Sequence, residues 1–229
     1  MSIPVLIMGR SGSGKTFSIK NFAADEVGVI SVEKGRLPFK SDIKVVRVPE
    51  QLETEASTAG QLNAARYAWI QMIVKTAKAK AIVIDDSQYL LVNELFDRAK
   101  EKGYDKYVDM AANFRSLVHS INKLPEDDKI VYFLHHTETD DNGRQKAKTI
   151  GRMLDEKLCV EGLFPIVIDA RVIQGDDGRP KHVFITENDG TNLAKAPEGM
   201  LPPVMDNDLA EVDRLIREYW GMRPIVEQA

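Results

Sequence analysis

Residues 3–16 read IPVLIMGRSGSGKT, an apolar run followed by a glycine-rich loop. The apolar part, residues 3–8, is short and uninterrupted, which is typical of a strand buried on both faces of a parallel sheet. The loop fits the pattern G-x-x-x-x-G-K-[ST] at every position from Gly9 to Thr16, and a helix is expected over about residues 15–24. A strand, a glycine loop and a helix in this order predict an α/β fold with a phosphate-binding loop, rather than a chance glycine-rich turn.

The residues of this loop have distinct physical roles. Its glycines allow a tight turn that points backbone N–H groups inward, toward phosphate oxygens. Lys15 would place a cation against the β- and γ-phosphates, and the Thr16 hydroxyl is a hard oxygen ligand for Mg²⁺. We therefore expect ATP and Mg²⁺ as cofactors. The residues expected to bind the nucleotide form one unbroken stretch: Gly9, Arg10, Ser11, Gly12, Ser13, Gly14, Lys15, Thr16 and Phe17.

A second apolar run ends in two carboxylates. Asp85 and Asp86 directly follow residues 81–84. In open α/β sheets, ligands bind at the carboxyl ends of the strands, so we expect Asp85 to hold the Mg²⁺ together with Thr16, through a bound water molecule. Asp86 can either polarise a water molecule or cap the helix expected near Ser87, and we favour the cap.

Glu33 stands at the end of the apolar run over residues 27–32. A carboxylate at this strand end can orient the attacking water molecule toward the γ-phosphate. The alternative is an ordinary loop glutamate that pairs with Lys34 or Arg36. We interpret Glu33 as catalytic.

Two histidines end the strand expected over residues 130–134. A polar side chain at that position can contact the γ-phosphate, and of His135 and His136 we prefer His136. A metal site is less fitting, because neighbours on a strand point to opposite faces and no Cys or His partner stands at metal spacing. The expected catalytic residues are therefore Lys15, Glu33, Asp85 and His136, and the expected metal ligands are Thr16 and Asp85.

The rest of the chain continues the alternation of strands and helices. Apolar residues at helical spacing predict helices, and Gly175-Asp176-Asp177-Gly178 predicts a hairpin turn. The pattern indicates one domain, residues 1–229, with a mainly parallel sheet, helices on both faces and a C-terminal β-hairpin. Beyond the segments named above, we expect strands over 43–48, 166–174 and 182–187, loops over 49–58 and 137–152, and helices over about 59–77, 88–101, 105–123, 152–161 and 207–219, the last capped by Asn207 or Asp208.

Composition narrows the class of protein. The chain has 229 residues, of which 43% are hydrophobic and 29% charged, with a formal net charge of -4. These values are typical of a globular protein and give no global attraction to nucleic acid or to an acidic membrane. A single cysteine, Cys159, excludes an internal disulfide framework. With no secretory signal or membrane span evident, we expect a cytoplasmic protein.

The four elements in this order resemble the RecA-like branch of P-loop ATPases. In that branch a catalytic glutamate, a Walker B aspartate and a polar sensor occupy the places of Glu33, Asp85 and His135 or His136. More narrowly, the chain is similar to small phage-encoded AAA/RecA-type ATPases associated with DNA recombination and single-strand annealing. That resemblance rests on IDDSQYL (84–90), FLHHTE (133–138), KTIGRMLD (148–155), VEGLF (160–164) and the late NDG and KAP motifs at 188–190 and 195–197. It implies a three-layer RecA-like P-loop NTPase fold.

The resemblance also implies partners. It implies a homo-oligomer acting on single-stranded DNA, with a phage or host replication or recombination protein as a possible partner. In RecA-like proteins the loop after the sensor strand meets DNA, which maps to residues 137–152. This segment carries Lys146 and Lys148 but no aromatic residue on which bases could stack. Either lysine can instead reach a neighbour's ATP, or the loop can simply be a solvated surface.

Two other classes of function compete with a DNA-stimulated ATPase. A P-loop kinase for a small molecule would need an arginine-rich lid, and no arginine cluster stands outside residues 144–152. A switch such as a helicase loader would use ATP binding without rapid turnover. Glu33 discriminates between the motor and the switch, because a slow switch gains weight if Glu33 is not catalytic.

Overall fold

The computed structural model describes residues 1–33, 35–126 and 128–225. Its sheet has the strand order β3-β2-β4-β5-β1-β7-β8-β9, and β6 pairs with the outer end of β5. The strands from β3 to β7 in this order are parallel, and β8 and β9 add an antiparallel edge, as the α/β prediction required. The strands are β1 (Ile3–Gly9), β2 (Val27–Ser31), β3 (Val45–Arg47), β4 (Ala81–Asp85), β5 (Ile130–Thr139), β6 (Gln145–Ala147), β7 (Ile166–Gln174), β8 (Pro180–Ile185) and β9 (Val204–Asp206).

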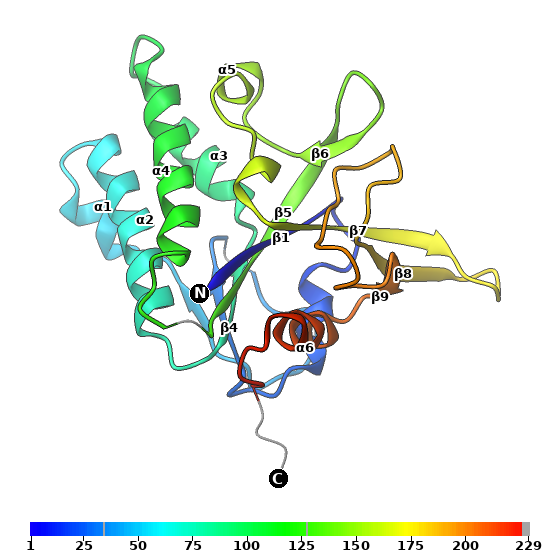
Figure 1. The fold of residues 1–229 in the computed structure, drawn as a ribbon. Helices are drawn as coiled ribbons and strands as arrows, with labels where there is room; N and C mark the ends of the chain where they lie inside the picture. Colours follow the sequence, from blue (N-terminus) through cyan, green and yellow to red (C-terminus); the bar gives the residue numbers. More distant parts are fainter. Residues whose placement is uncertain (34, 127, 226–229) are drawn as a thin grey trace.

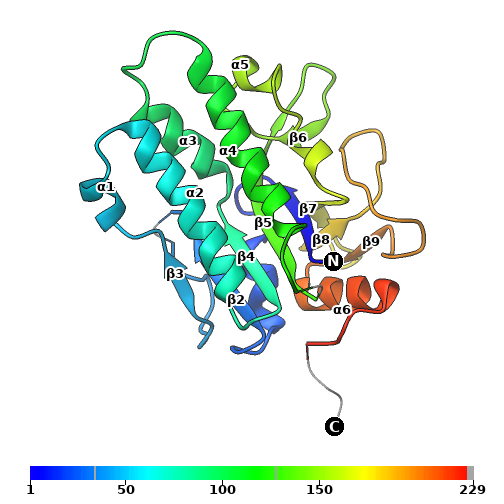
Figure 2. The same ribbon diagram turned by 60° about the vertical axis from the view of Figure 1, so that its left-hand side comes forward.

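Strand β1 lies in the middle of the sheet, between β5 and β7, and all seven of its residues are buried. Its side chains alternate between two apolar clusters: Leu6 and Met8 face one, and Val5 and Ile7 face the other. The helices α2 (Ala59–Thr76), α3 (Gln88–Asp97) and α4 (Asp105–Ile121) lie on the first side, and η1 (Thr16–Asn21) and α6 (Leu209–Trp220) on the second (Figures 1 and 2). A three-layer fold follows from these two cores.

Four local predictions were wrong. The helix expected over 15–24 is the short 3-10 helix η1, because the Ser18 hydroxyl bonds to the Lys15 carbonyl and competes with α-helical bonding. The loop expected over 49–58 contains α1 (Gln51–Glu55). The loop expected over 137–152 is largely a hairpin, since β5 runs on to Thr139 and turns back as β6. The helix expected over 152–161 divides into α5 (Arg152–Asp155) and η2 (Glu161–Leu163).

The C-terminal part folds back onto the phosphate loop. The expected hairpin forms between β7 and β8, and β9, which we did not predict, adds a third antiparallel strand. Helix α6 follows, capped by the Asp208 side chain, which accepts from the backbone N–H groups of Ala210 and Glu211. Because α6 packs against η1, this arm brings residues more than 160 positions away in the sequence to the loop.

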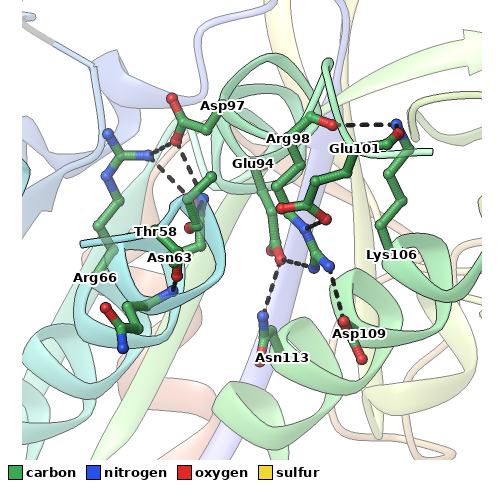
Figure 3. A network of polar contacts seen from close by, with 12 residues as sticks. Thr58, Asn63, Arg66, Glu94, Asp97, Arg98, Glu101, Lys106, Asp109 and Asn113 are labelled. Carbon is green, nitrogen blue, oxygen red and sulfur yellow. Dashed lines mark hydrogen bonds and ion pairs between the residues drawn. The ribbon is translucent and has the colours of Figure 1, made fainter. Parts of the chain in front are cut away.

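Helix α3, which starts two residues after Asp86, is fixed by a polar network (Figure 3). Arg98 lies just past its end, with a side chain only 8% exposed, and donates to the buried Glu94 at 3.2 Å. Asn113 of α4 donates to the same Glu94 oxygen at 3.0 Å. On the other flank, Arg66 of α2 pairs with Asp97. These contacts hold α3 to both neighbouring helices, and α3 supplies one wall of the cavity described next.

Candidate functional site

The phosphate loop and strand β4 meet through Thr16 and Asp85. The Thr16 hydroxyl lies 3.0 Å from one carboxylate oxygen of Asp85 and 3.3 Å from the other. Asp85 reaches the loop because β4, β5 and β1 are parallel, so that their carboxyl ends open on one edge of the sheet. A hydroxyl and a carboxylate side by side are hard oxygen ligands of the kind Mg²⁺ prefers.

Four carbonyls of the loop are bound by side-chain donors. The Lys15 ammonium donates to the carbonyls of Gly9, at 2.8 Å, and Arg10, at 3.1 Å. From the C-terminal arm, Nδ1 of His182 lies 3.0 Å from the Ser13 carbonyl, and the Asn207 amide donates to the Gly14 carbonyl at 3.0 Å. The backbone of the loop is thus held in shape by its own lysine and by two side chains of the C-terminal arm.

The N–H groups of the loop lack such partners. Within the part of the chain that the structure describes, the N–H groups of Ser11, Gly12, Gly14 and Lys15 donate to no protein acceptor. The Ser13 hydroxyl is buried and also has no hydrogen-bond partner there. Unpaired donors gathered in one small loop are what a bound anion would satisfy. The residues present therefore fit a nucleotide phosphate chain with Mg²⁺.

Two ionisable groups of the site have shifted pKa values. Burial lowers the pKa of Lys15 to about 8, although the nearby carboxylates of Asp86, Asp85 and Asp169 oppose the shift. Burial also raises the pKa of Asp85 to about 6, with a further contribution from the charge of Asp86. Desolvation penalises both charges, and a phosphate near Lys15 and a cation near Asp85 would compensate it.

The two histidines of β5 lie in different environments. His135 is fully buried between the Ser87 hydroxyl and the Lys148 carbonyl, and burial lowers its pKa to about 4, so the ring is neutral. His136 faces the loop and contacts the Asp86 carboxylate at 3.2 Å. Our preference for a cap role of Asp86 was wrong: among the described residues no side chain caps α3, and the Asp86 carboxylate instead contacts His136, with a positive backbone φ of 59°.

His136 and Asp86 line an open cavity of about 1320 Å³, which we call the phosphate cavity. The loop residues Lys15 and Thr16 also line it, as do residues of α3. A non-glycine residue with positive φ is strained, and such residues concentrate at functional sites. Asp86 thus presents its carboxylate to the same space as the loop.

Comparison with known families agrees with this geometry. A family model described as an AAA domain matches residues 1–197. The chain belongs to the AAA domain family. No curated protein matches the sequence closely enough to count as a relative. Nucleotide binding by an ATPase domain is the activity that membership in this family supports. Within the AAA domain and the rest of the described chain, none of the helices is both long and apolar enough to cross a membrane.

Glu33 of the AAA domain lies apart from the phosphate cavity. Its carboxylate accepts a hydrogen bond of 3.0 Å from Asn93 of α3. Together with Asn93 it lines a separate cavity of about 970 Å³ between β2, α1, α2 and α3. Of its two expected alternative partners, Lys34 lies outside the described residues. The structure thus brings together Lys15, Thr16, Asp85 and His136, while Glu33 lines the separate cavity.

Arg10 and Phe17, near the two ends of the stretch predicted to bind the nucleotide, also contact other parts of the protein. The Arg10 guanidinium reaches Thr139 and Gln145 of the β5–β6 hairpin, at 3.3 and 3.4 Å. Phe17 is 39% exposed and meets Phe39 edge to face, with ring centroids 6.0 Å apart. The AAA domain therefore links its phosphate loop to the hairpin through Arg10.

The basic residues of segment 137–152 differ in whether their side chains already form ion pairs within the protein. Lys146 is held between Glu138, at 3.0 Å, and Asp155, at 2.8 Å. Arg144 pairs with Asp140 across the turn. Lys148, in contrast, is exposed at the rim of the phosphate cavity, and no ion pair of its side chain occurs among the described residues. The two lysines that the sequence could not separate are thus distinct in the AAA domain.

Three contacts of the loop were not predicted from the sequence. His182 and Asn207 bind loop carbonyls, as described above, and the buried Asp169 of β7 lies near Lys15. Asp169 is held by Arg171 at 2.6 Å. The sequence signal for Asp169 was a charged residue inside the apolar run of β7, which a buried strand seldom carries without a partner. His182 and Asn207 gave no such signal.

Proposed function

We propose that the chain binds ATP with Mg²⁺ at residues 9–17 and hydrolyses it. One observation carries this proposal: four N–H groups of the loop have no acceptor among the described residues, while four carbonyls of the same loop are bound by side chains. Such a loop is organised for phosphate oxygens before any ligand arrives. The Thr16–Asp85 pair adds oxygen ligands for Mg²⁺ at the β4 side of the loop.

The residues at the phosphate cavity would have separate roles in ATP binding and hydrolysis. Lys15 would exchange its carbonyl partners for the β- and γ-phosphates, and Thr16 and Asp85 would hold Mg²⁺, which neutralises the phosphate charge. His136 would contact the γ-phosphate from the end of β5. Asp86 and Glu33 are the two carboxylates available to orient water. We assign that role to Glu33, as expected from its strand end, which requires it to leave Asn93.

The finer proposal is an oligomeric ATPase that acts on single-stranded DNA in phage recombination or replication. It rests on the sequence resemblance and on Lys148, which is exposed, follows the hairpin directly and lines the phosphate cavity. A lysine there can contact either a DNA phosphate or the ATP of a neighbouring copy. Arg10 would connect either event to the phosphate loop, because it binds the hairpin.

A second function is favoured by the Glu33–Asn93 hydrogen bond. With its carboxylate engaged outside the phosphate cavity, Glu33 cannot activate water there. A chain that keeps this arrangement would bind ATP and hydrolyse it slowly, as a conformational switch such as a helicase loader does.

Phosphate release from MgATP, measured with and without single-stranded DNA, tests the proposal. Stimulation by single strands and not by duplex supports the DNA-dependent ATPase. Slow turnover that ignores DNA supports the switch. Absence of both ATP binding and turnover would refute both functions. Asp85→Asn provides a control for the metal: it should raise the Mg²⁺ concentration needed for half-maximal turnover.

A further inference from the structure

His182 contacts the phosphate loop from the C-terminal arm but is not confined to that contact. Its ring lies on β8, is exposed, and also lines the phosphate cavity. Gly14 permits the close approach: a Cβ added there would lie 2.9 Å from Nδ1 of His182 and closer still to Asn207. The ring therefore stands at the loop itself, on the side that faces β7 and β8.

The contact with the loop fixes the tautomer of His182. A carbonyl oxygen can only accept, so Nδ1, 3.0 Å from the Ser13 carbonyl, must carry the proton. In the neutral ring Nε2 is then an acceptor. Nε2 has no hydrogen-bond partner within residues 1–33, 35–126 and 128–225. Nε2 of His182 is thus an oriented hydrogen-bond acceptor at the phosphate cavity, available to a donor of a ligand.

The orientation of the nucleotide follows from the metal ligands. Thr16 and Asp85 would hold Mg²⁺ on the β4 side of β1, and the metal would supply charge neutralisation at the terminal phosphates. The α-phosphate and the nucleoside would then leave the loop on the other side, toward β7, β8 and the start of α6. His182 and Asn207 form that side.

We infer that His182 is the residue that recognises the nucleoside, by accepting a hydrogen bond at Nε2 from a ribose hydroxyl. The ribose is the part of the nucleoside nearest to the α-phosphate, and its hydroxyls are donors, whereas the phosphates at neutral pH are acceptors. This inference rests on the proposed function, since it assigns one contact within the same site. It makes binding sensitive to removal of one ribose hydroxyl, either the 2′ or the 3′.

Binding of four ligands separates recognition of the nucleoside from simple support of the loop. We would measure the dissociation constants of MgATP, its 2′-deoxy and 3′-deoxy analogues, and Mg²⁺-tripolyphosphate, which has no nucleoside. His182→Asn is the informative variant, because the asparagine amide nitrogen can occupy the place of Nδ1 while Nε2 is lost. His182→Ala removes both contacts.

The wild-type chain should bind one deoxy analogue about three- to ten-fold more weakly than ATP, the effect of one hydrogen bond. His182→Asn should bind ATP weaker by the same factor, bind tripolyphosphate within two-fold of wild type, and no longer distinguish the deoxy analogue. His182→Ala should weaken both ATP and tripolyphosphate.

Two results would overturn the inference. In the first, His182→Asn weakens tripolyphosphate as much as ATP, which would make His182 a support of the loop. In the second, neither deoxy analogue differs from ATP in the wild type. Failure of the proposed function looks different, because the wild-type chain would then bind neither ATP nor tripolyphosphate.

Discussion

The Thr16 hydroxyl lies 3.0 Å from the Asp85 carboxylate, although the two residues are 69 positions apart in the sequence and strand β5 separates their strands. This contact brings the metal-binding hydroxyl of the loop and the metal-binding carboxylate of β4 to one point. Lys15, buried beside them, and Asp85 both carry charges that burial disfavours. The site is therefore electrostatically incomplete until a ligand supplies opposite charges.

Binding of MgATP should have a pH window between about 6 and about 8. Below pH 6, Asp85 becomes protonated and loses its metal-binding form, and above pH 8 Lys15 loses its charge. The dissociation constant of MgATP, measured by calorimetry from pH 5 to pH 9.5, should rise on both sides. A flat profile would show that neither group contacts the ligand.

The free energy of unfolding without ligand should depend on pH through the same two groups. The folded pKa of Asp85 lies above its ordinary value of 3.8, so the folded state binds more protons and stability falls as pH rises from about 4 to 6. The folded pKa of Lys15 lies below 10.5, so the unfolded state binds more protons above pH 8 and stability rises there. Lys15→Met should remove the upper limb in denaturant titrations. An unchanged upper limb would show that another group titrates.

Glu33→Gln should reduce ATP turnover by about 100-fold or more, because it removes a general base, while the affinity for ATP stays within about two-fold. Asp86→Asn is the matched variant, since Asp86 already faces the phosphate cavity. Turnover per active site and ATP binding should be measured for both. If Asp86→Asn loses turnover and Glu33→Gln keeps it, the water-orienting role belongs to Asp86.

Lys148→Ala should reduce DNA-stimulated turnover, while Lys146→Ala should have a smaller effect on it. The reason is that Lys146 is already held by Glu138 and Asp155, whereas Lys148 is exposed at the phosphate cavity. The salt dependence of binding to single-stranded DNA tells what Lys148 contacts: loss of one phosphate contact lowers the slope by about 0.7. Equal effects of the two substitutions would contradict this distinction.

Much of the fold could be predicted because the central strands are buried on both faces. β1, β4 and β5 are continuous apolar runs, and each begins and ends close to where the sequence placed it, apart from the polar extension of β5. That extension and β6 were missed because their pairing is polar, as in Glu138 opposite Lys146. The Asn142-Gly143 turn between them was an available signal.

The candidate site likewise has residues that the sequence could predict and residues that it could not. Lys15, Thr16 and Asp85 belong to local motifs, and their chemistry could be predicted from a few neighbouring residues. The contacts of His182 and Asn207 could not be predicted, because only the tertiary structure brings β8 and the start of α6 to the loop. The position of Glu33 also depends on tertiary structure, since Asn93 of α3 determines where its carboxylate lies.

Calorimetric titration of the wild-type chain and of Lys15→Ala with ATP, in the presence and absence of Mg²⁺, tests the central claim most directly. The wild-type chain should bind one ATP per chain, more tightly with Mg²⁺ than without. Lys15→Ala should lose most of that affinity, because it removes the cation expected to contact the β- and γ-phosphates. Equal binding by both chains, or no binding by the wild type, would contradict the assignment of residues 9–17 as the nucleotide site.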